Sequence, residues 1–81
     1  SYMTEFPHND IYLLVSNNIK KYRKVNKMTQ KELAKRSGYS YAFIRRIEGP
    51  NCKKNFSLQT VFIISYALGI EIKSLFEDDN I

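Results

Sequence analysis

The chain has 81 residues, of which 43% are hydrophobic, 26% are charged and 14% are aromatic. This is too short for two conventional domains, too rich in aromatic residues for a disordered chain, and without the run of about 18 apolar residues that a membrane span needs. The chain has a single cysteine, Cys52, and therefore no internal disulfide. We expect no zinc site, because one cysteine and one histidine are too few for the usual set of ligands. We therefore expect one small soluble cytoplasmic domain with no metal, cofactor, membrane or small-molecule partner.

The net charge of +5 is distributed unevenly along the chain. The stretch from Lys20 to Lys54 contains twelve basic and two acidic residues, a net charge of +10, whereas the remainder contains one basic and six acidic residues. Basic stretches attract nucleic-acid phosphates, but they also occur as solvated surfaces that bind nothing acidic. Charge alone therefore makes nucleic acid a candidate partner.

Hydrophobic spacing predicts a first helix that follows an N-terminal extension of residues 1–10. We interpret residues 1–2, which precede a methionine, as a cloning remnant. Asn9 and Asp10 offer N-cap side chains, and the pattern fades around Asn26. The apolar residues at helical spacing are Ile11, Leu14, Val15, Ile19 and Tyr22.

A second and a third helix are predicted close together. Thr29 and Glu32 are spaced as a capping box, in which the Thr29 oxygen accepts from the Glu32 amide and the Glu32 carboxylate reaches back. Gly38 ends this second helix, because glycine readily adopts a left-handed conformation. The third helix spans Ser40 to Glu48 and is ended by a Gly-Pro pair. Two short helices around a tight turn are typical of a helix-turn-helix.

The rest of the chain predicts a polar, basic loop followed by two more helices. Ser57 caps a fourth helix from Leu58 to Leu68, which Gly69 ends, and a short helix around residues 72–76 follows. We therefore expect an all-α fold, a compact bundle of five helices over residues 11–77, with an acidic tail over residues 78–81.

The third helix has two chemically different faces. At about 100° per residue, its apolar residues group on one arc, which can pack on the domain. Arginine can donate two hydrogen bonds to guanine, and an alanine methyl can contact the methyl group of thymine. The alternative is a polar face that contacts only water. The candidate base-reading residues on this face are Tyr41, Ala42, Arg45 and Arg46, and the apolar residues opposite are Phe43, Ile44 and Ile47.

Residues 16–77 closely resemble the Cro/C1-type (XRE family) helix-turn-helix regulators. The resemblance implies a fold like the DNA-binding domain of lambda repressor and sequence-specific binding of double-stranded DNA, as in small repressors and restriction-modification controller proteins. The motifs that carry it, in chain order, are Ile19–Arg23, Met28–Ala34, Gly38–Ser40, Ile44–Glu48, Ser57–Leu58, Ala67–Ile70 and Leu75–Phe76.

The resemblance also implies roles for individual residues. Gln30 matches a glutamine that binds a DNA phosphate and braces the recognition helix, and Arg23 and Glu48 match an internal ion pair. The four candidate base-reading residues match the variable positions that read bases. The loop before the fourth helix is about two residues longer than usual, which makes its position-by-position match doubtful. The further candidates for phosphate binding are Ser40, Asn51, Lys53, Lys54 and Asn55.

The fourth helix is apolar nearly all round, which predicts burial on more than one side. Leu58, Val61, Ile64 and Leu68 share one stripe and are the expected core residues. The apolar residues that lie off this stripe lead us to expect a homodimer interface. Two-fold symmetry of such a dimer would imply a palindromic operator. Covering by residues 2–6, or scattered surface apolar residues, are the alternatives. The predicted interface residues are Phe62, Ile63, Tyr66 and Ile72.

The function predicted from the sequence is a bacterial or phage-encoded transcriptional regulator. The alternative is a protein-interaction module of the same fold, an antitoxin or an adaptor, with secondary DNA binding. We expect no enzyme, because His8 is isolated and nothing in the sequence suggests a histidine partner for Cys52. A redox-sensing role of the Cys52 thiol remains open, since neighbouring lysines favour the thiolate.

Overall fold

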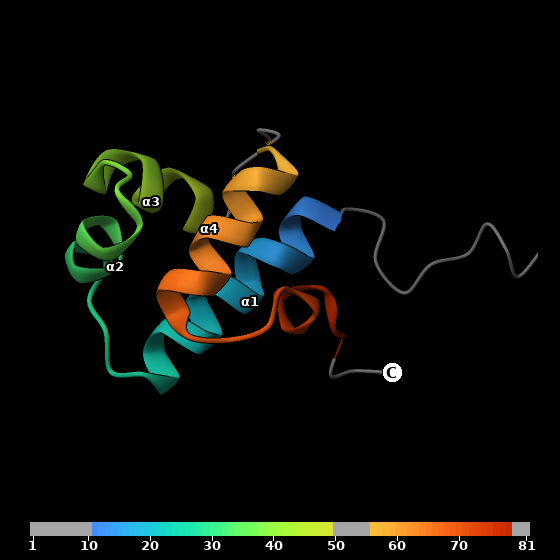
Figure 1. The fold of residues 1–81 in the computed structure, drawn as a ribbon. Helices are drawn as coiled ribbons and strands as arrows, with labels where there is room; N and C mark the ends of the chain where they lie inside the picture. The colour runs from blue at the N-terminus through green and yellow to red at the C-terminus, as the bar shows by residue number, and fades with distance from the viewer. Residues whose placement is uncertain (1–10, 50–55, 79–81) are drawn as a thin grey trace, which may run out of the picture.

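The computed structural model describes residues 11–49 and 56–78. In these ranges the chain forms four α-helices and one short 3-10 helix, η2, and no strand (Figure 1). The predicted all-α fold is confirmed, and the last of its five helices is of the 3-10 type. The helices are α1 (Ile11–Val25), α2 (Gln30–Ser37), α3 (Tyr41–Glu48), α4 (Leu58–Leu68) and η2 (Ile72–Phe76).

Short side chains cap three of these helices at the predicted positions. The hydroxyl oxygens of Thr29, Ser40 and Ser57 each accept a hydrogen bond of 3.0 Å from the backbone amide three residues later. The second half of the predicted capping box is wrong, since the Glu32 carboxylate accepts from Arg36 at 3.1 Å instead of from the Thr29 amide. The Arg36 guanidinium, one turn along α2, is the stronger donor because it is charged.

The turn between α2 and α3 depends on Gly38. Its φ of 84° lies in the left-handed region, and its amide donates to the Ala34 carbonyl at 2.9 Å. This ends α2 and allows α3 to start only three residues later. The two helices therefore form the compact helix-turn-helix pair that the sequence predicts.

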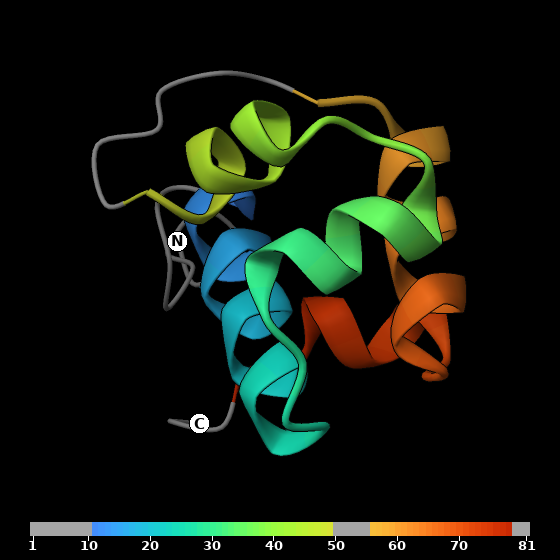
Figure 2. The same ribbon diagram turned by 90° about the vertical axis from the view of Figure 1, so that its left-hand side faces the viewer.

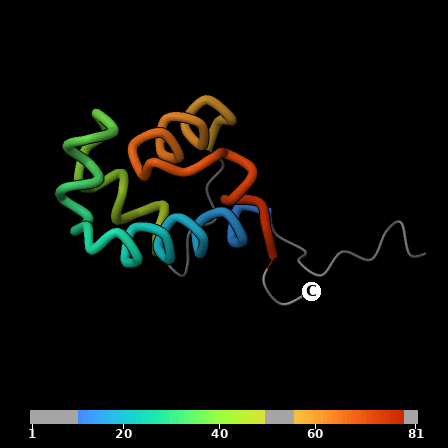
Figure 3. Tube along the Cα trace, turned by 60° about the horizontal axis from the view of Figure 1, so that its bottom comes forward, coloured from blue at the N-terminus to red at the C-terminus, as the bar shows by residue number. Residues whose placement is uncertain are grey.

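The helices pack in two groups around one apolar core. Helices α2 and α3 lie together at one end, while α1, α4 and η2 form the rest of the bundle (Figures 2 and 3). Helix α2 also contacts α4, and α3 contacts α1, so both helices of the helix-turn-helix pair pack on the rest of the bundle. The buried core residues are Val15, Ile19, Met28, Leu33, Ala34, Ile44, Ile47, Val61, Ile64, Leu68 and Leu75.

The predicted core stripe of α4 is wrong at Leu58. Val61, Ile64 and Leu68 are buried as expected, but Leu58 is 69% exposed. Leu58 is the first residue of α4, and the buried core begins only at Val61, one turn later. The Leu58 side chain instead lines an apolar hollow between α1, α4 and η2, as does Phe76.

Two asparagine side chains of α1, which sequence analysis did not single out, hold the last elements in place. Asn18 Nδ2 donates to the carbonyl oxygens of Leu75 and Glu77, both at 2.9 Å. Asn26 Nδ2 donates to the Leu68 carbonyl at 2.8 Å. These bonds satisfy carbonyls near the ends of η2 and α4 and fix both elements against α1. In the part of the chain that the structure describes, no helix is long and apolar enough to cross a membrane.

Candidate nucleic-acid interface

Helix α3 presents its polar side to solvent. Ile44 and Ile47 are fully buried and Phe43 is half-buried, so the apolar arc packs on the domain as its spacing predicts. The four residues expected on the opposite arc are all exposed. They are Tyr41, Ala42, Arg45 and Arg46.

Both arginines of this face lie over aromatic rings. The Arg45 guanidinium carbon is 5.4 Å from the centre of the Tyr41 ring, and the Arg46 guanidinium carbon is 5.3 Å from the centre of the Phe43 ring. Lys31 of α2 also places its ammonium nitrogen 5.4 Å from the Tyr41 ring centre. These distances are within the range of favourable cation–π contacts. Lys31 therefore joins this surface, and sequence analysis missed it because the contact crosses from one helix to another.

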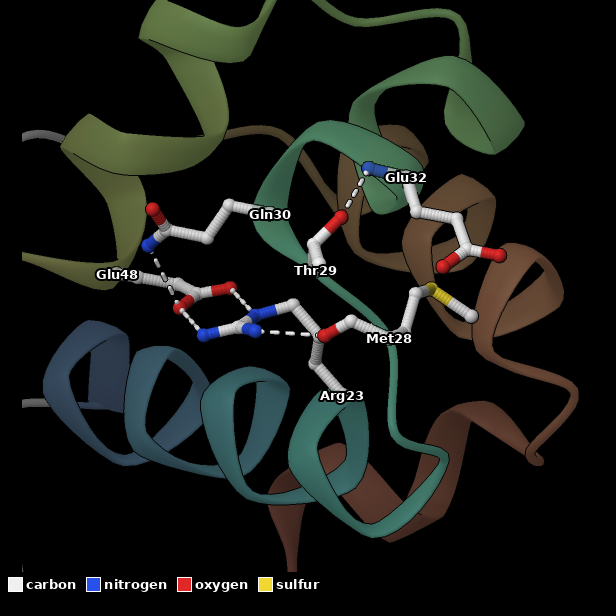
Figure 4. Close-up of polar contacts among 6 residues, drawn as sticks. All are labelled: Arg23, Met28, Thr29, Gln30, Glu32 and Glu48. Atoms are coloured by element: carbon white, nitrogen blue, oxygen red, sulfur yellow. Dashed lines mark hydrogen bonds and ion pairs between the residues drawn. The ribbon is translucent and has the colours of Figure 1, made fainter.

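A buried ion pair ties α1 to α3 (Figure 4). Arg23 Nε donates to Glu48 Oε2 at 2.7 Å, and Arg23 Nη2 donates to Glu48 Oε1 at 2.9 Å. The two side chains are only 10% and 1% exposed. Arg23 Nη1 also donates to the Met28 carbonyl at 2.7 Å, so the guanidinium is held on three sides. This is the pairing that the family resemblance implies, and it leaves Arg23 unavailable as a contact to an external anion.

Gln30, the first residue of α2, is attached to the same cluster. Its Nε2 donates to Glu48 Oε1 at 3.1 Å, which links the start of α2 to the end of α3 (Figure 4). Thr29, Gln30 and Lys31 line a hollow together with Arg23 and Tyr41. The free amides of a helix N-terminus favour anions, and Lys31 adds a positive charge there.

The charged side chains on the solvent-facing side of α3 are all positive. Glu48 is the only acidic residue of α3, and it is buried against Arg23. The acidic residue of α2, Glu32, pairs with Arg36 at 3.1 Å on the exposed side of that helix. The solvent-facing side of α3 is therefore cationic, with no exposed carboxylate of its own.

The other predicted phosphate contacts fall in two places. Ser40 is exposed at the start of α3, where its hydroxyl accepts from the Phe43 amide. Four of the candidates lie outside the described residues. These are Asn51, Lys53, Lys54 and Asn55.

The residues predicted for a dimer interface lie on α4 and η2. Phe62 and Tyr66 are 56% and 81% exposed, whereas Ile63 and Ile72 are half-buried. Leu58, which the sequence assigned to the core, precedes them at the same helical spacing, so the exposed apolar stripe runs the length of α4. Large exposed apolar side chains that adjoin each other indicate an interaction surface.

The described ranges, residues 11–49 and 56–78, contain no group of three histidine, cysteine, aspartate or glutamate side chains that could hold a metal ion.

The sequence matches the helix-turn-helix family (HTH_3) over residues 19–75. The chain belongs to this family of DNA-binding transcriptional regulators. It is 30% identical over 66 residues to the control protein C.SmaI of Serratia marcescens, covering 82% of this chain and 76% of that protein. The resemblance to Cro/C1-type regulators is thereby confirmed.

Two solved structures of the same kind share the fold. The restriction-modification controller protein C.AhdI of Aeromonas hydrophila is 25% identical, with a TM-score of 0.72 over 80% of this chain and 96% of that chain. SinR, a master regulator for biofilm formation solved in complex with DNA, is 28% identical, with a TM-score of 0.70 over 78% of this chain and 98% of that chain.

Proposed function

We propose that this helix-turn-helix protein binds a specific operator in double-stranded DNA as a homodimer, with α3 as the recognition helix. The observation that carries the proposal is the exposed face of α3, which presents two arginines, a tyrosine and a small alanine without any exposed carboxylate. The relative SinR, of similar fold, was solved with DNA bound, which supports DNA as the partner.

The chemistry of this face suits the major groove. The groove is about 12 Å wide and admits one α-helix. Arg45 and Arg46 can each donate two hydrogen bonds to guanine O6 and N7, and the small side chain of Ala42 lets the helix backbone approach the bases. The exposed Tyr41 side chain can contact a phosphate or a base edge.

Phosphate contacts would set the position of α3 in the groove. Gln30 and Ser40 stand at the starts of α2 and α3, where unpaired backbone amides favour anions. We extend this role to the basic loop, whose lysines and asparagines can contact phosphates on the adjoining backbone. The loop residues concerned are Asn51, Lys53, Lys54 and Asn55.

The exposed stripe on α4 supports a two-fold dimer. Leu58, Phe62 and Tyr66 follow one another at intervals of four residues, and the half-buried Ile63 of α4 and Ile72 of η2 are the other candidate interface residues. A two-fold interface uses the same patch on both subunits, so one continuous apolar stripe is sufficient. Dimers of this motif place two recognition helices about 34 Å apart, which implies a palindromic operator.

The same stripe is the observation in favour of a second function. An antitoxin or adaptor of this fold would use Leu58, Phe62 and Tyr66 to bind a different protein, and DNA binding would be secondary. A stable partner that copurifies, together with no enriched DNA sequence, would favour this alternative.

Replacing either arginine by alanine tests the assignment of base readers. We expect Arg45→Ala or Arg46→Ala to weaken operator binding by about 1–3 kcal/mol per contact and to relax the base preference at one position of each half-site. Lys53→Ala or Lys54→Ala should instead weaken binding to all sequences and flatten its salt dependence. Equilibrium titrations at several salt concentrations distinguish these effects, and equal, sequence-independent losses in both groups would show that the base readers are misassigned.

A further inference from the structure

The two arginines of α3 rest on aromatic rings that differ in how firmly they are held. Arg45 lies over Tyr41, the first residue of α3, which is 40% exposed. The Lys31 ammonium is equally close to the same ring, at 5.4 Å from its centre. Arg45 therefore shares a solvent-exposed ring with a second cation.

Arg46 rests on a ring that is connected to the bundle. Phe43 is half-buried and packs against the core. Its ring stacks on that of Tyr39, with centroids 4.7 Å apart and planes inclined by 28°. The Tyr39 hydroxyl in turn donates to Thr60 Oγ1 at 2.9 Å.

The last member of this series is fixed within α4. Thr60 is buried, its hydroxyl lies 3.0 Å from that of Ser57, and its amide donates to the Ser57 hydroxyl. A continuous series of contacts thus runs from Arg46 on the solvent face of α3, through two rings, to the first turn of α4. No comparable series leads from Arg45 into the core among the described residues.

We propose that Tyr39 and Phe43 are positioning residues that hold the Arg46 guanidinium in one orientation and make Arg46 the more selective of the two base readers. This inference rests on the proposed DNA-binding function. A guanidinium held over a ring, as that of Arg46 is at 5.3 Å from the centre of the Phe43 ring, can still donate from its N–H groups. Because a held arginine loses less conformational freedom on binding, it binds the matching base more tightly.

Holding the Arg46 guanidinium in one orientation also increases its discrimination against wrong bases. A loosely held arginine can turn from a mismatched base to a nearby phosphate and recover part of its binding energy there. Arg46 lies over the half-buried Phe43 ring and therefore has less freedom to make this exchange than Arg45, which shares the exposed Tyr41 ring with Lys31. A wrong base opposite Arg46 therefore leaves its donors unpaired, which increases the cost of the mismatch.

The test compares the base preferences of matched variants. Dissociation constants are measured for every single-base variant of the operator selected by the native protein, and Arg45→Ala and Arg46→Ala identify the position that each arginine reads. We expect Phe43→Leu to lower discrimination about two- to fivefold at the Arg46 position alone, from the size of one exposed cation–π contact. Tyr41→Leu should lower discrimination at the Arg45 position and leave the Arg46 position unchanged.

Tyr39→Phe is the conservative variant, because it keeps both rings and removes only the hydroxyl bond to Thr60. We expect it to lower discrimination at the Arg46 position by less than Phe43→Leu does. Urea unfolding of each variant measures any loss of stability. If Tyr39 and Phe43 had a purely structural role, their variants would weaken binding to all duplexes by the same factor. That uniform result would overturn the inference.

The failure of the inference can be distinguished from the failure of the proposed function. If Arg45→Ala and Arg46→Ala both leave every base preference unchanged, the assignment of α3 as the recognition helix fails. If Arg46→Ala abolishes a base preference that both Phe43→Leu and Tyr39→Phe retain in full, only the positioning role is overturned.

Discussion

Replacing Glu48 by alanine is expected to destabilise the domain by about 3–5 kcal/mol. The substitution leaves the Arg23 guanidinium buried without its carboxylate, and an uncompensated buried charge is costly. Domains of this size have a total stability of about 4–12 kcal/mol, so the variant would lose a large part of its stability. Urea unfolding followed by circular dichroism measures the change in the free energy of unfolding.

The exposed pair on α2 provides the matched control for Glu48→Ala. Arg36 and Glu32 are bonded at 3.1 Å but are about half exposed, so Arg36→Ala should cost no more than about 0.5 kcal/mol. The double variant Arg23→Met with Glu48→Leu should recover most of the loss, because it removes both charges together. A Glu48→Ala variant no less stable than Arg36→Ala would contradict a structural role for the buried pair.

Replacing Tyr66 by aspartate is expected to convert the proposed dimer into a monomer. The side chain is 81% exposed on α4, so the substitution should leave the fold of one subunit intact. In a two-fold interface it buries one carboxylate from each subunit on an apolar surface, where burying unpaired charge is unfavourable. Operator affinity should fall about 100-fold or more, since a monomer binds one half-site without the gain from the second.

Sedimentation velocity at micromolar concentration measures this change directly. The native protein should sediment as a dimer of the 9.5 kDa chain, and Tyr66→Asp as a single chain. Val25→Asp is the control, because Val25 is an exposed apolar residue at the end of α1 and is not one of the stripe residues of α4. A native protein that is already monomeric, with the same sedimentation as Tyr66→Asp, would contradict the proposed interface.

The helix boundaries could be predicted from the sequence because the signals that set them are local. Thr29, Ser40 and Ser57 cap the amides three residues later, and Gly38 and Gly69 end helices with positive φ angles. Each of these interactions involves residues close in the chain. The predictions for the two faces of α3 succeeded for the same reason, since helical periodicity alone divides them.

Two predictions failed because residue spacing alone does not specify which neighbours a side chain contacts. Leu58 has the spacing of a core residue, but the core starts one turn further along α4. The Glu32 carboxylate pairs with Arg36, a residue one turn later that the capping-box pattern does not include.

The contacts that organise the candidate interface also lay beyond sequence analysis. Gln30 with Glu48 and Tyr39 with Thr60 join residues that are 18 and 21 positions apart. Hydropathy and spacing describe single elements, so they carry no information about which side chains meet across two helices. The Arg23–Glu48 pair was anticipated only through the resemblance to Cro/C1-type regulators.

Selection of bound duplexes from a random DNA library tests most directly whether α3 reads a palindromic operator. We expect the native protein to enrich one motif made of two inverted half-sites about one helical turn apart, and Arg46→Ala to lose the preference at one position in each half-site. A library that shows no enriched sequence after selection, or a motif that both arginine variants retain unchanged, would contradict specific recognition by this helix.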